Sequence, residues 1–182
     1  RLREAQRILA LAGECILIEN LPGIRWSKLI QNATLSGMSA ALGSPYADIL
    51  DHDKATAAAA WVGNEMCKIV RARNIVLEDL VPGWSYYALE FDDQAGLEKS
   101  MRWLREYFKP HRSLKASMLQ DMEKGRKCEI DQIVGLPCAW GKKLGIPTPT
   151  CQTIVDIVKD FEAGIIPMPS MACWDRFNLP QF

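Results

Sequence analysis

Three polar residues have the types and the spacing of a reactive site. Lys28, Asn32 and Ser36 recur every fourth residue in an otherwise apolar stretch, so in a helix they would share one face. A lysine ammonium can stabilise or protonate an oxygen that becomes negatively charged in a reaction. An asparagine one turn away can donate hydrogen bonds without adding charge. The same stripe also fits the solvated side of an amphipathic helix, and spacing alone leaves both interpretations open.

A second group of candidates lies in the second half of the chain. Ser117 is expected near a helix start, where a hydroxyl and backbone N–H groups can hold a carboxylate together. Glu129 could orient a lysine and keep its ammonium charged. Each has a structural alternative. Ser117 and Gln120 fit a capping box. Glu129 and Asp131 fit the first turn of a helix, where acidic side chains are favoured.

The elements that must position these residues are helices. Residues 25–42 carry apolar side chains at a helical period and are followed by Gly43, which predicts the helix of the polar stripe. Residues 53–73 predict a second long helix with an alanine-rich first half. Either Asp51 or Asp53 could cap this second helix.

The remaining sequence predicts further helices and an extended tail. Helical patterns cover residues 1–12, 94–109, 113–124, 129–145 and 149–162. Pro137 should kink or divide the fourth of these segments. No alternation of strands and helices appears, so the predicted fold class is all-α, a helical bundle. We expect one helical domain over residues 1–164 and a proline- and aromatic-rich extended tail over residues 165–182, and assign no element to residues 74–92.

Charge and hydropathy exclude several classes of partner. Lysine plus arginine and aspartate plus glutamate number 22 each, so no net charge favours nucleic acid or an anionic membrane surface. No apolar run reaches the roughly 20 residues of a membrane span, and no signal-type segment opens the chain. We therefore expect a soluble, cytoplasmic protein without nucleic-acid or membrane partners.

The cysteines and histidines predict no metal site. The six cysteines are widely spaced without a CxxC motif, which is typical of buried thiols in a reducing compartment. His52 and His111 are the two histidines, and neither has a partner at metal-ligand spacing. The sequence also lacks a GxGxxG motif, so this chain offers no site of the usual kind for a dinucleotide pyrophosphate.

Two separated motifs resemble those of the ketopantoate reductase family. Residues 26–32, Trp-Ser-Lys-Leu-Ile-Gln-Asn, resemble the family's W-x-K-L-x-x-N segment. Residues 117–135 contain Ser-Met-Leu-Gln-Asp, Gly-Arg, Glu-Ile-Asp and Gly in the family's order. Residues 145–149, Gly-Ile-Pro-Thr-Pro, resemble the stretch that follows in the family. The resemblance extends over residues 10–160 and is weakest between residues 43 and 111.

This resemblance implies a fold, a reaction and a set of roles. The fold would be the helical C-terminal domain of ketopantoate reductases and of 6-phosphogluconate dehydrogenase-like proteins. The reaction would be the NADPH-dependent reduction of 2-dehydropantoate to pantoate, with hydride from an N-terminal Rossmann domain absent from this chain, so the isolated chain is expected to be inactive. By position, the family's roles fall on catalytic Lys28 and Glu129 and on substrate-binding Asn32, Ser36 and Ser117.

One departure from the family pattern leaves the substrate open. Ser36 stands where the family often has a second asparagine, and a hydroxyl reaches less far and offers one donor instead of two. The alternatives are a reductase of another branched or bulky 2-oxo acid, or a non-catalytic interaction module in which Lys28 and Glu129 form a buried ion pair. A domain built to pack against an absent partner should expose apolar surface, so we also predict a homodimer.

Overall fold

The chain folds into helices joined by loops. The computed structural model describes residues 1–182 and contains no β-strand, which confirms the all-α prediction. The α-helices are α1 (Leu2–Leu9), α2 (Leu21–Gln31), α3 (Met38–Leu42), α4 (Tyr46–Asp51), α5 (Asp53–Ala72), α6 (Gln94–Tyr107), α7 (Ser117–Glu123), α8 (Leu136–Leu144) and α9 (Pro149–Glu162). The π-helical segments are η1 (Asn32–Gly37) and η4 (Asp131–Gly135), and the 3₁₀ segments are η2 (Tyr86–Leu89), η3 (Lys109–His111) and η5 (Met171–Arg176).

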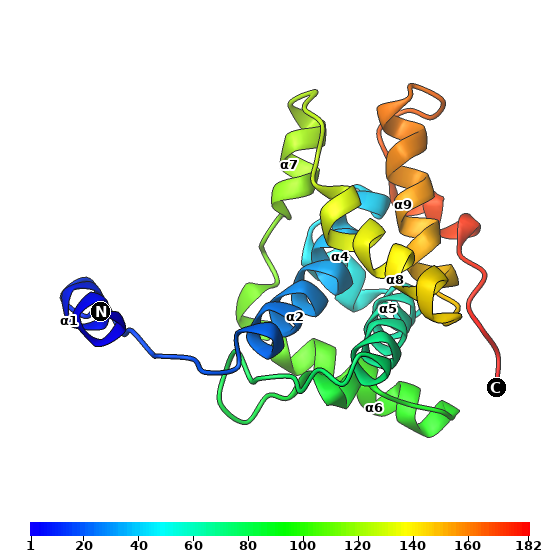
Figure 1. Cartoon of the computed structure of the whole chain (residues 1–182). Coiled ribbons are helices and arrows are strands. Elements are labelled where there is room, and N and C mark those ends of the chain that lie inside the picture. The colour runs from blue at the N-terminus through cyan, green and yellow to red at the C-terminus, as the bar shows by residue number, and fades with distance from the viewer.

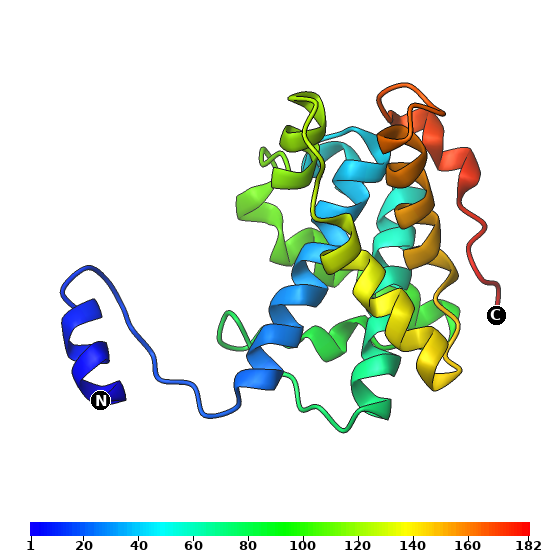
Figure 2. The same ribbon diagram turned by 45° about the horizontal axis from the view of Figure 1, so that its top comes forward.

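The predicted helix of the polar stripe is longer than expected and is not regular. α2, η1 and α3 follow one another without a break as one composite helix (Figures 1 and 2). It begins at Leu21 because the Asn20 side chain accepts a hydrogen bond from the Gly23 N–H at 3.0 Å. It ends at Gly43, whose φ of 58° lies in the left-handed region, as the glycine signal predicts. The π-helical segment in its middle has no counterpart in the sequence pattern.

α5 is the central helix of the body. It contacts α2, α4, α6, α8 and α9, and the alanines of its first half are largely buried, which lets neighbouring helices approach closely (Figure 1). Its N-cap is His52, whose Nδ1 accepts from the Ala55 N–H at 3.2 Å. The predicted caps were wrong because both aspartates pair with arginines: Asp51 with Arg112, and Asp53 with Arg105.

A buried carboxylate joins α5 to the start of α9. Glu65 of α5 is only 4% exposed, and its two oxygens accept hydrogen bonds from the backbone N–H groups of Thr150 at 2.8 Å and Cys151 at 2.9 Å. These N–H groups belong to the first turn of α9, which has no intrahelical acceptor for them. Burial raises the pKa of Glu65, and the two backbone donors oppose that rise. Glu65 therefore fixes α9 to the centre of the body.

Pro137 does not divide the helix predicted over residues 129–145. The π-helical segment η4 continues directly into α8, and Gly135 at their junction has helical φ and ψ of -64° and -34°. Pro137 is the second residue of α8, so the change from π-helix to α-helix lies just before it. The two π-helical segments, η1 and η4, are in contact. Apolar side chains of both segments are buried, among them Ala33 and Leu35 of η1 and Ile133 and Val134 of η4.

The two ends of the chain differ in how they meet the body. α1 lies apart from the other helices and has no buried residue (Figures 1 and 2). The tail, residues 165–182, is not extended throughout, because it contains η5. Phe182 stacks on Trp61 of α5 with ring centroids 5.5 Å apart, and Phe177 is buried. The tail is therefore packed on the body through its aromatic side chains.

The tail contact at Gly43 gives a matched test. Gly43 and Gly145 both end helices at positive φ, 58° and 69°, where an alanine costs about 1–2 kcal/mol. At residue 43 a Cβ would also collide with the Pro169 carbonyl oxygen, whereas nothing lies within 4 Å of a Cβ at residue 145. In urea denaturation we expect Gly43→Ala to lower the free energy of unfolding by about 2 kcal/mol more than Gly145→Ala. Equal losses would show that the tail does not lie against α3.

The cysteines are partly as predicted. All six are free thiols; Cys67, Cys128 and Cys151 are buried, whereas Cys15, Cys138 and Cys173 are partly exposed. No group of three or more His, Cys, Asp or Glu side chains is arranged to hold a metal ion. None of the helices combines the length and the apolar character needed to cross a membrane.

Candidate functional site

The polar stripe runs from the surface of the composite helix into its interior. Lys28 is exposed, Asn32 is half-buried, and Ser36 is only 9% exposed. The Ser36 hydroxyl hydrogen-bonds to the Tyr46 hydroxyl at 2.7 Å. A wholly solvated face would not bury Ser36, so that interpretation of the stripe is wrong for its last residue.

Lys28 and Asn32 meet at a cavity of about 220 Å³. Its walls come from α2 and η1, from α4, and from the segment around η3; the lining residues are Lys28, Gln31, Asn32, Tyr46, Phe108, His111 and Leu114. An adjoining cavity of about 390 Å³ shares Lys28, Gln31 and His111 with it. Ser36 is linked to the smaller cavity through its hydrogen bond to Tyr46. The structure thus connects three of the predicted site residues to one space.

Ser117 lies outside these cavities, on a neighbouring surface. It is the exposed first residue of α7, and Ala116 is the N-cap without a side-chain bond. The capping box was wrong, because the Gln120 side chain donates to the Lys115 carbonyl oxygen instead. The Ser117 hydroxyl makes no hydrogen bond within the chain. α7 contacts η1, so Ser117 belongs to an element that borders the helix of Asn32.

Glu129 is also exposed and lies just before η4. It forms no ion pair with Lys28 or with any other cation. The alternative of a buried Lys28–Glu129 ion pair was therefore wrong. Asn32 is the first residue of η1, and Glu129 precedes η4 by two residues. Because η1 and η4 are in contact, Glu129 and Asn32 belong to neighbouring segments. The convergence of Lys28 and Glu129 on one substrate stays a prediction.

A chain of hydrogen bonds leads from Lys28 into the interior. The Lys28 ammonium donates to Gln31 Oε1 at 2.9 Å, and Gln31 Nε2 donates to the Tyr107 hydroxyl at 3.4 Å. The Tyr86 hydroxyl donates to the same Tyr107 oxygen at 2.9 Å. Burial raises the pKa of Tyr86, and the Tyr107 phenol adds to that rise, so Tyr86 remains a neutral donor. Gln31 is thus placed to hold the Lys28 ammonium at the cavity.

Several residues of this arrangement were missed by the sequence analysis. Gln31 could have been found, because it is three residues from Lys28 and so lies on the same side of a helix. Tyr46, Phe108 and His111 carry no such signal, since they reach the cavity from elements far away in the sequence.

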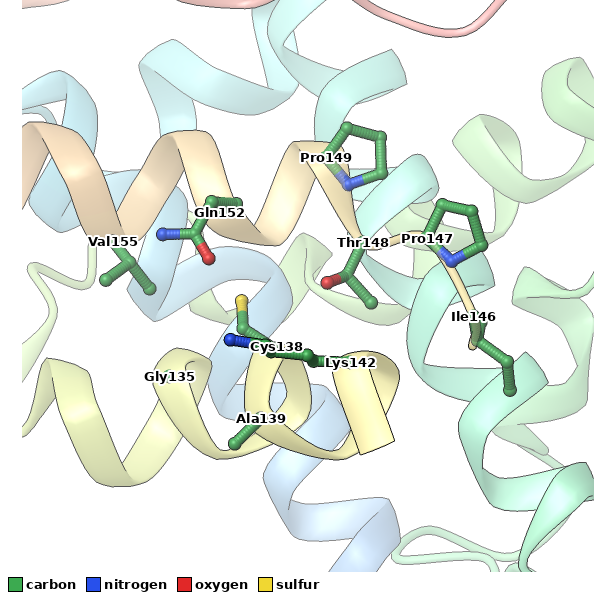
Figure 3. Close-up of a pocket in the computed structure, with 10 residues that line it drawn as sticks. All are labelled: Gly135, Cys138, Ala139, Lys142, Ile146, Pro147, Thr148, Pro149, Gln152 and Val155. Atoms are coloured by element: carbon green, nitrogen blue, oxygen red, sulfur yellow. The ribbon is translucent and has the colours of Figure 1, made fainter. Parts of the chain in front are cut away.

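A larger cavity, of about 620 Å³, contains none of the predicted site residues. It lies between α8 and the start of α9, and Figure 3 shows Cys138 pointing towards Thr148 and Gln152. The Cys151 thiol lowers the pKa of the Cys138 thiol, while burial opposes this effect. Size alone therefore does not select the cavity beside Lys28; it is chosen because two predicted site residues, Lys28 and Asn32, line it.

Comparison with known families identifies the family of this chain. The sequence model described as "Ketopantoate reductase PanE/ApbA C terminal" matches residues 20–162, a range that contains α2 to α9 and all five predicted site residues. The chain belongs to the ketopantoate reductase family. Within this family the match is to the C-terminal domain, as the two sequence motifs predicted. No curated protein matches the chain.

Solved structures show the same fold. A ternary structure of D-mandelate dehydrogenase with NADH and anilino(oxo)acetate has a TM-score of 0.70 and 22% identity, over 90% of this chain and 48% of that one. A PanE/ApbA family ketopantoate reductase from Ralstonia eutropha JMP134 has a TM-score of 0.69 and 25% identity, over 89% and 48%. A dimeric ketopantoate reductase from Staphylococcus aureus has a TM-score of 0.64 and 17% identity, over 90% and 52%. The chain thus spans about half the length of each of these three proteins.

Proposed function

We propose that this domain binds the substrate and supplies the proton in an NADPH-dependent reductase of a 2-oxo acid. The observation that supports it best is the joint position of Lys28 and Asn32 at one cavity, on the helix that carries the family motif. The family resemblance implies 2-dehydropantoate as the acid and pantoate as the product. Ser36 departs from the family pattern, so another 2-oxo acid is the second candidate.

The dinucleotide does not fit the residues of this chain. No glycine-rich turn precedes any of its helices, and the backbone donors of the α9 first turn are already held by Glu65. We therefore assign the cofactor to a second domain and derive no step through it from this chain. Two related structures contain NADH, whereas the resemblance implies NADPH.

The proposed roles concern the carbonyl oxygen and the carboxylate of the substrate. When the carbonyl is reduced, its oxygen becomes an alkoxide that must be stabilised or protonated, and the Lys28 ammonium can do both. One N–H group of the ammonium donates a hydrogen bond to Gln31, which leaves its other N–H groups for the substrate. The Asn32 amide can donate to the same substrate. Ser117 would bind the carboxylate, and Glu129 would orient Lys28 once the substrate is bound.

We also propose that the domain forms a homodimer. The relative from Staphylococcus aureus is described as dimeric. The N-terminal part of this chain exposes large apolar side chains, among them Leu2, Leu11 and Ile16. Sedimentation that shows only monomer up to near-millimolar concentration would contradict the dimer.

An activity assay tests the function. The full-length reductase, with its nucleotide-binding domain, should oxidise NADPH when 2-dehydropantoate or another 2-oxo acid is added, and not without it. The 182-residue chain alone should be helical by circular dichroism and should not oxidise NADPH with any 2-oxo acid. If the full-length protein fails to oxidise NADPH with every 2-oxo acid tested, the proposal is contradicted and the interaction module is favoured.

A further inference from the structure

Two of the free cysteines meet where α8 packs on the start of α9. Cys138 belongs to α8 and Cys151 to the first turn of α9, and the two helices are in contact. Figure 3 shows the Cys138 side chain pointing from α8 towards Thr148 and Gln152. At the start of α9, residues 148, 151 and 152 share one face, because they are three and four positions apart. Cys138 therefore faces Cys151 across the contact between the two helices.

The two thiols act directly on one another. The Cys151 thiol lowers the pKa of Cys138, and the Cys138 thiol raises the pKa of Cys151. Opposite shifts of this kind arise when one sulfur donates its proton in a hydrogen bond to the other, because the bond favours the charged form of the acceptor. Burial opposes the shift in pKa at Cys138 and adds to the shift at Cys151. Cys138 is therefore the thiol of the pair that loses its proton first.

Access from solvent also distinguishes the two thiols. Cys138 is partly exposed and lines the cavity of about 620 Å³, whereas Cys151 is 0% exposed. Lys142, one turn after Cys138 on α8, lines the same cavity and brings a positive charge to it. Redox-sensitive cysteines are accessible thiols with a lowered pKa, and a second thiol beside them completes a disulfide. Cys138 has the properties of the attacking thiol, and Cys151 those of the resolving thiol.

A buried carboxylate beside Cys151 can take up its proton. Glu65 accepts a hydrogen bond from the Cys151 backbone N–H at 2.9 Å, and its charge adds to the rise in the pKa of the Cys151 thiol. Burial raises the pKa of Glu65 itself, which makes its carboxylate a stronger base than an exposed one. These three residues have no part in the proposed reduction, and none of them lines the cavity beside Lys28. They form a second, separate group of reactive side chains.

We propose that Cys138 and Cys151 form a reversible disulfide when the chain meets a hydroperoxide such as hydrogen peroxide. In the first step the Cys138 thiolate attacks one peroxide oxygen, so that an S–O bond forms and the O–O bond breaks. The released hydroxide takes up a proton and becomes water, and Cys138 is left as a sulfenic acid.

In the second step the Cys151 sulfur attacks the Cys138 sulfur and passes its proton to Glu65. The S–S bond forms and the S–O bond breaks, and the hydroxide that leaves takes up this proton as water. Two electrons thus pass from the two thiols to the peroxide, which is reduced to two molecules of water. A dithiol reverses the reaction by thiol–disulfide exchange, so the covalent link between α8 and α9 follows the redox state of the surroundings.

Thiol counting on the 182-residue chain tests the proposal. After treatment with an equimolar amount of hydrogen peroxide, the native chain should lose two of its six thiols, and dithiothreitol should restore both. Mass spectrometry of the unreduced peptides should find residues 138 and 151 cross-linked within one chain, with the loss of two hydrogen atoms.

Three variants separate the two steps. Cys151→Ser removes the resolving thiol, so oxidation should stop at the Cys138 sulfenic acid, which dimedone traps as an adduct. Cys138→Ser should lose no pair of thiols, because peroxide does not reach the buried Cys151. Cys173→Ser is the matched control, since Cys173 is also partly exposed but lies on η5, and it should form the same cross-link as the wild-type chain. Circular dichroism of each variant checks the fold before treatment.

Several results would overturn the proposal. A disulfide between another pair of cysteines, or between two chains, would contradict the assigned pair. An unchanged count of six thiols would contradict oxidation. A dimedone adduct at Cys138 of the wild-type chain, with the Cys151 thiol intact, would show that Cys151 does not reach the Cys138 sulfur. All of these results leave the proposed reductase function untouched, because that function depends on other residues.

Discussion

Lys28→Ala in the full-length reductase is expected to lower kcat by about 10²–10⁴-fold, the range typical of a lost general acid. The reason is that Lys28 is the only lysine or arginine that lines the cavity of about 220 Å³, so the alkoxide loses its proposed proton donor. NADPH binding should be unchanged, because the cofactor is assigned to the other domain. Steady-state kinetics and a separate NADPH titration measure the two effects.

Lys142→Ala is the control for this variant, because Lys142 is an exposed lysine of α8 that lines neither cavity beside Lys28. It should have nearly wild-type kcat. Glu129→Ala should lower kcat in the same direction as Lys28→Ala but less severely, since Glu129 is proposed to orient the lysine. If Lys28→Ala behaves like Lys142→Ala, the catalytic assignment is wrong and the interaction module gains support.

Glu65→Ala is expected to lower the free energy of unfolding by about 3 kcal/mol. The substitution leaves the backbone N–H groups of Thr150 and Cys151 without an acceptor in a buried place and also opens a cavity. Denaturant titration measures the loss. Glu98→Ala, at an exposed glutamate of α6, should stay within about 0.5 kcal/mol of wild type. Similar losses in both variants would show that Glu65 does not hold α9.

The pH dependence of Glu65→Gln gives an independent measurement of the same contact. Because burial raises the pKa of Glu65, the folded chain binds the proton more tightly than the unfolded chain does. The stability that this group contributes is therefore fully present below its unfolded pKa and is lost as pH rises through the raised folded pKa. The difference in unfolding free energy between wild type and Glu65→Gln should shift in favour of wild type as pH falls through this window. A shift in the opposite direction would mean that the backbone donors outweigh burial.

The helices were largely predictable because their signals are local. α5 and α9 have the predicted bounds to within a residue, since a helical period marks both helices and Pro149 and Gly164 mark the two ends of α9. The cap of α5 was not predictable, because the choice between His52 and its neighbours depends on arginines far away in the sequence. The π-helical segments were missed because their apolar residues follow nearly the same spacing as those of an α-helix.

The candidate site was predictable to the extent that it lies on one helix. Lys28 and Asn32 are one turn apart, so a single period brings them together at the cavity. Ser36 was expected on the same face, but the π-helical segment and the bond to Tyr46 place it in the interior. Tyr46 and Phe108 come from separate elements, and only the packing of those elements shows that they face Lys28.

The π-helical segment η1 sets the rotational phase between the two halves of the composite helix. A π-helical turn amounts to one extra residue within an α-helix, and one residue corresponds to a rotation of about 100°. Without that extra residue, α2 would be turned about its own axis relative to α3, while the buried contacts of α3 stayed in place. The direction in which Lys28 faces is therefore set by one additional residue in the backbone of η1, the segment that follows it in the chain.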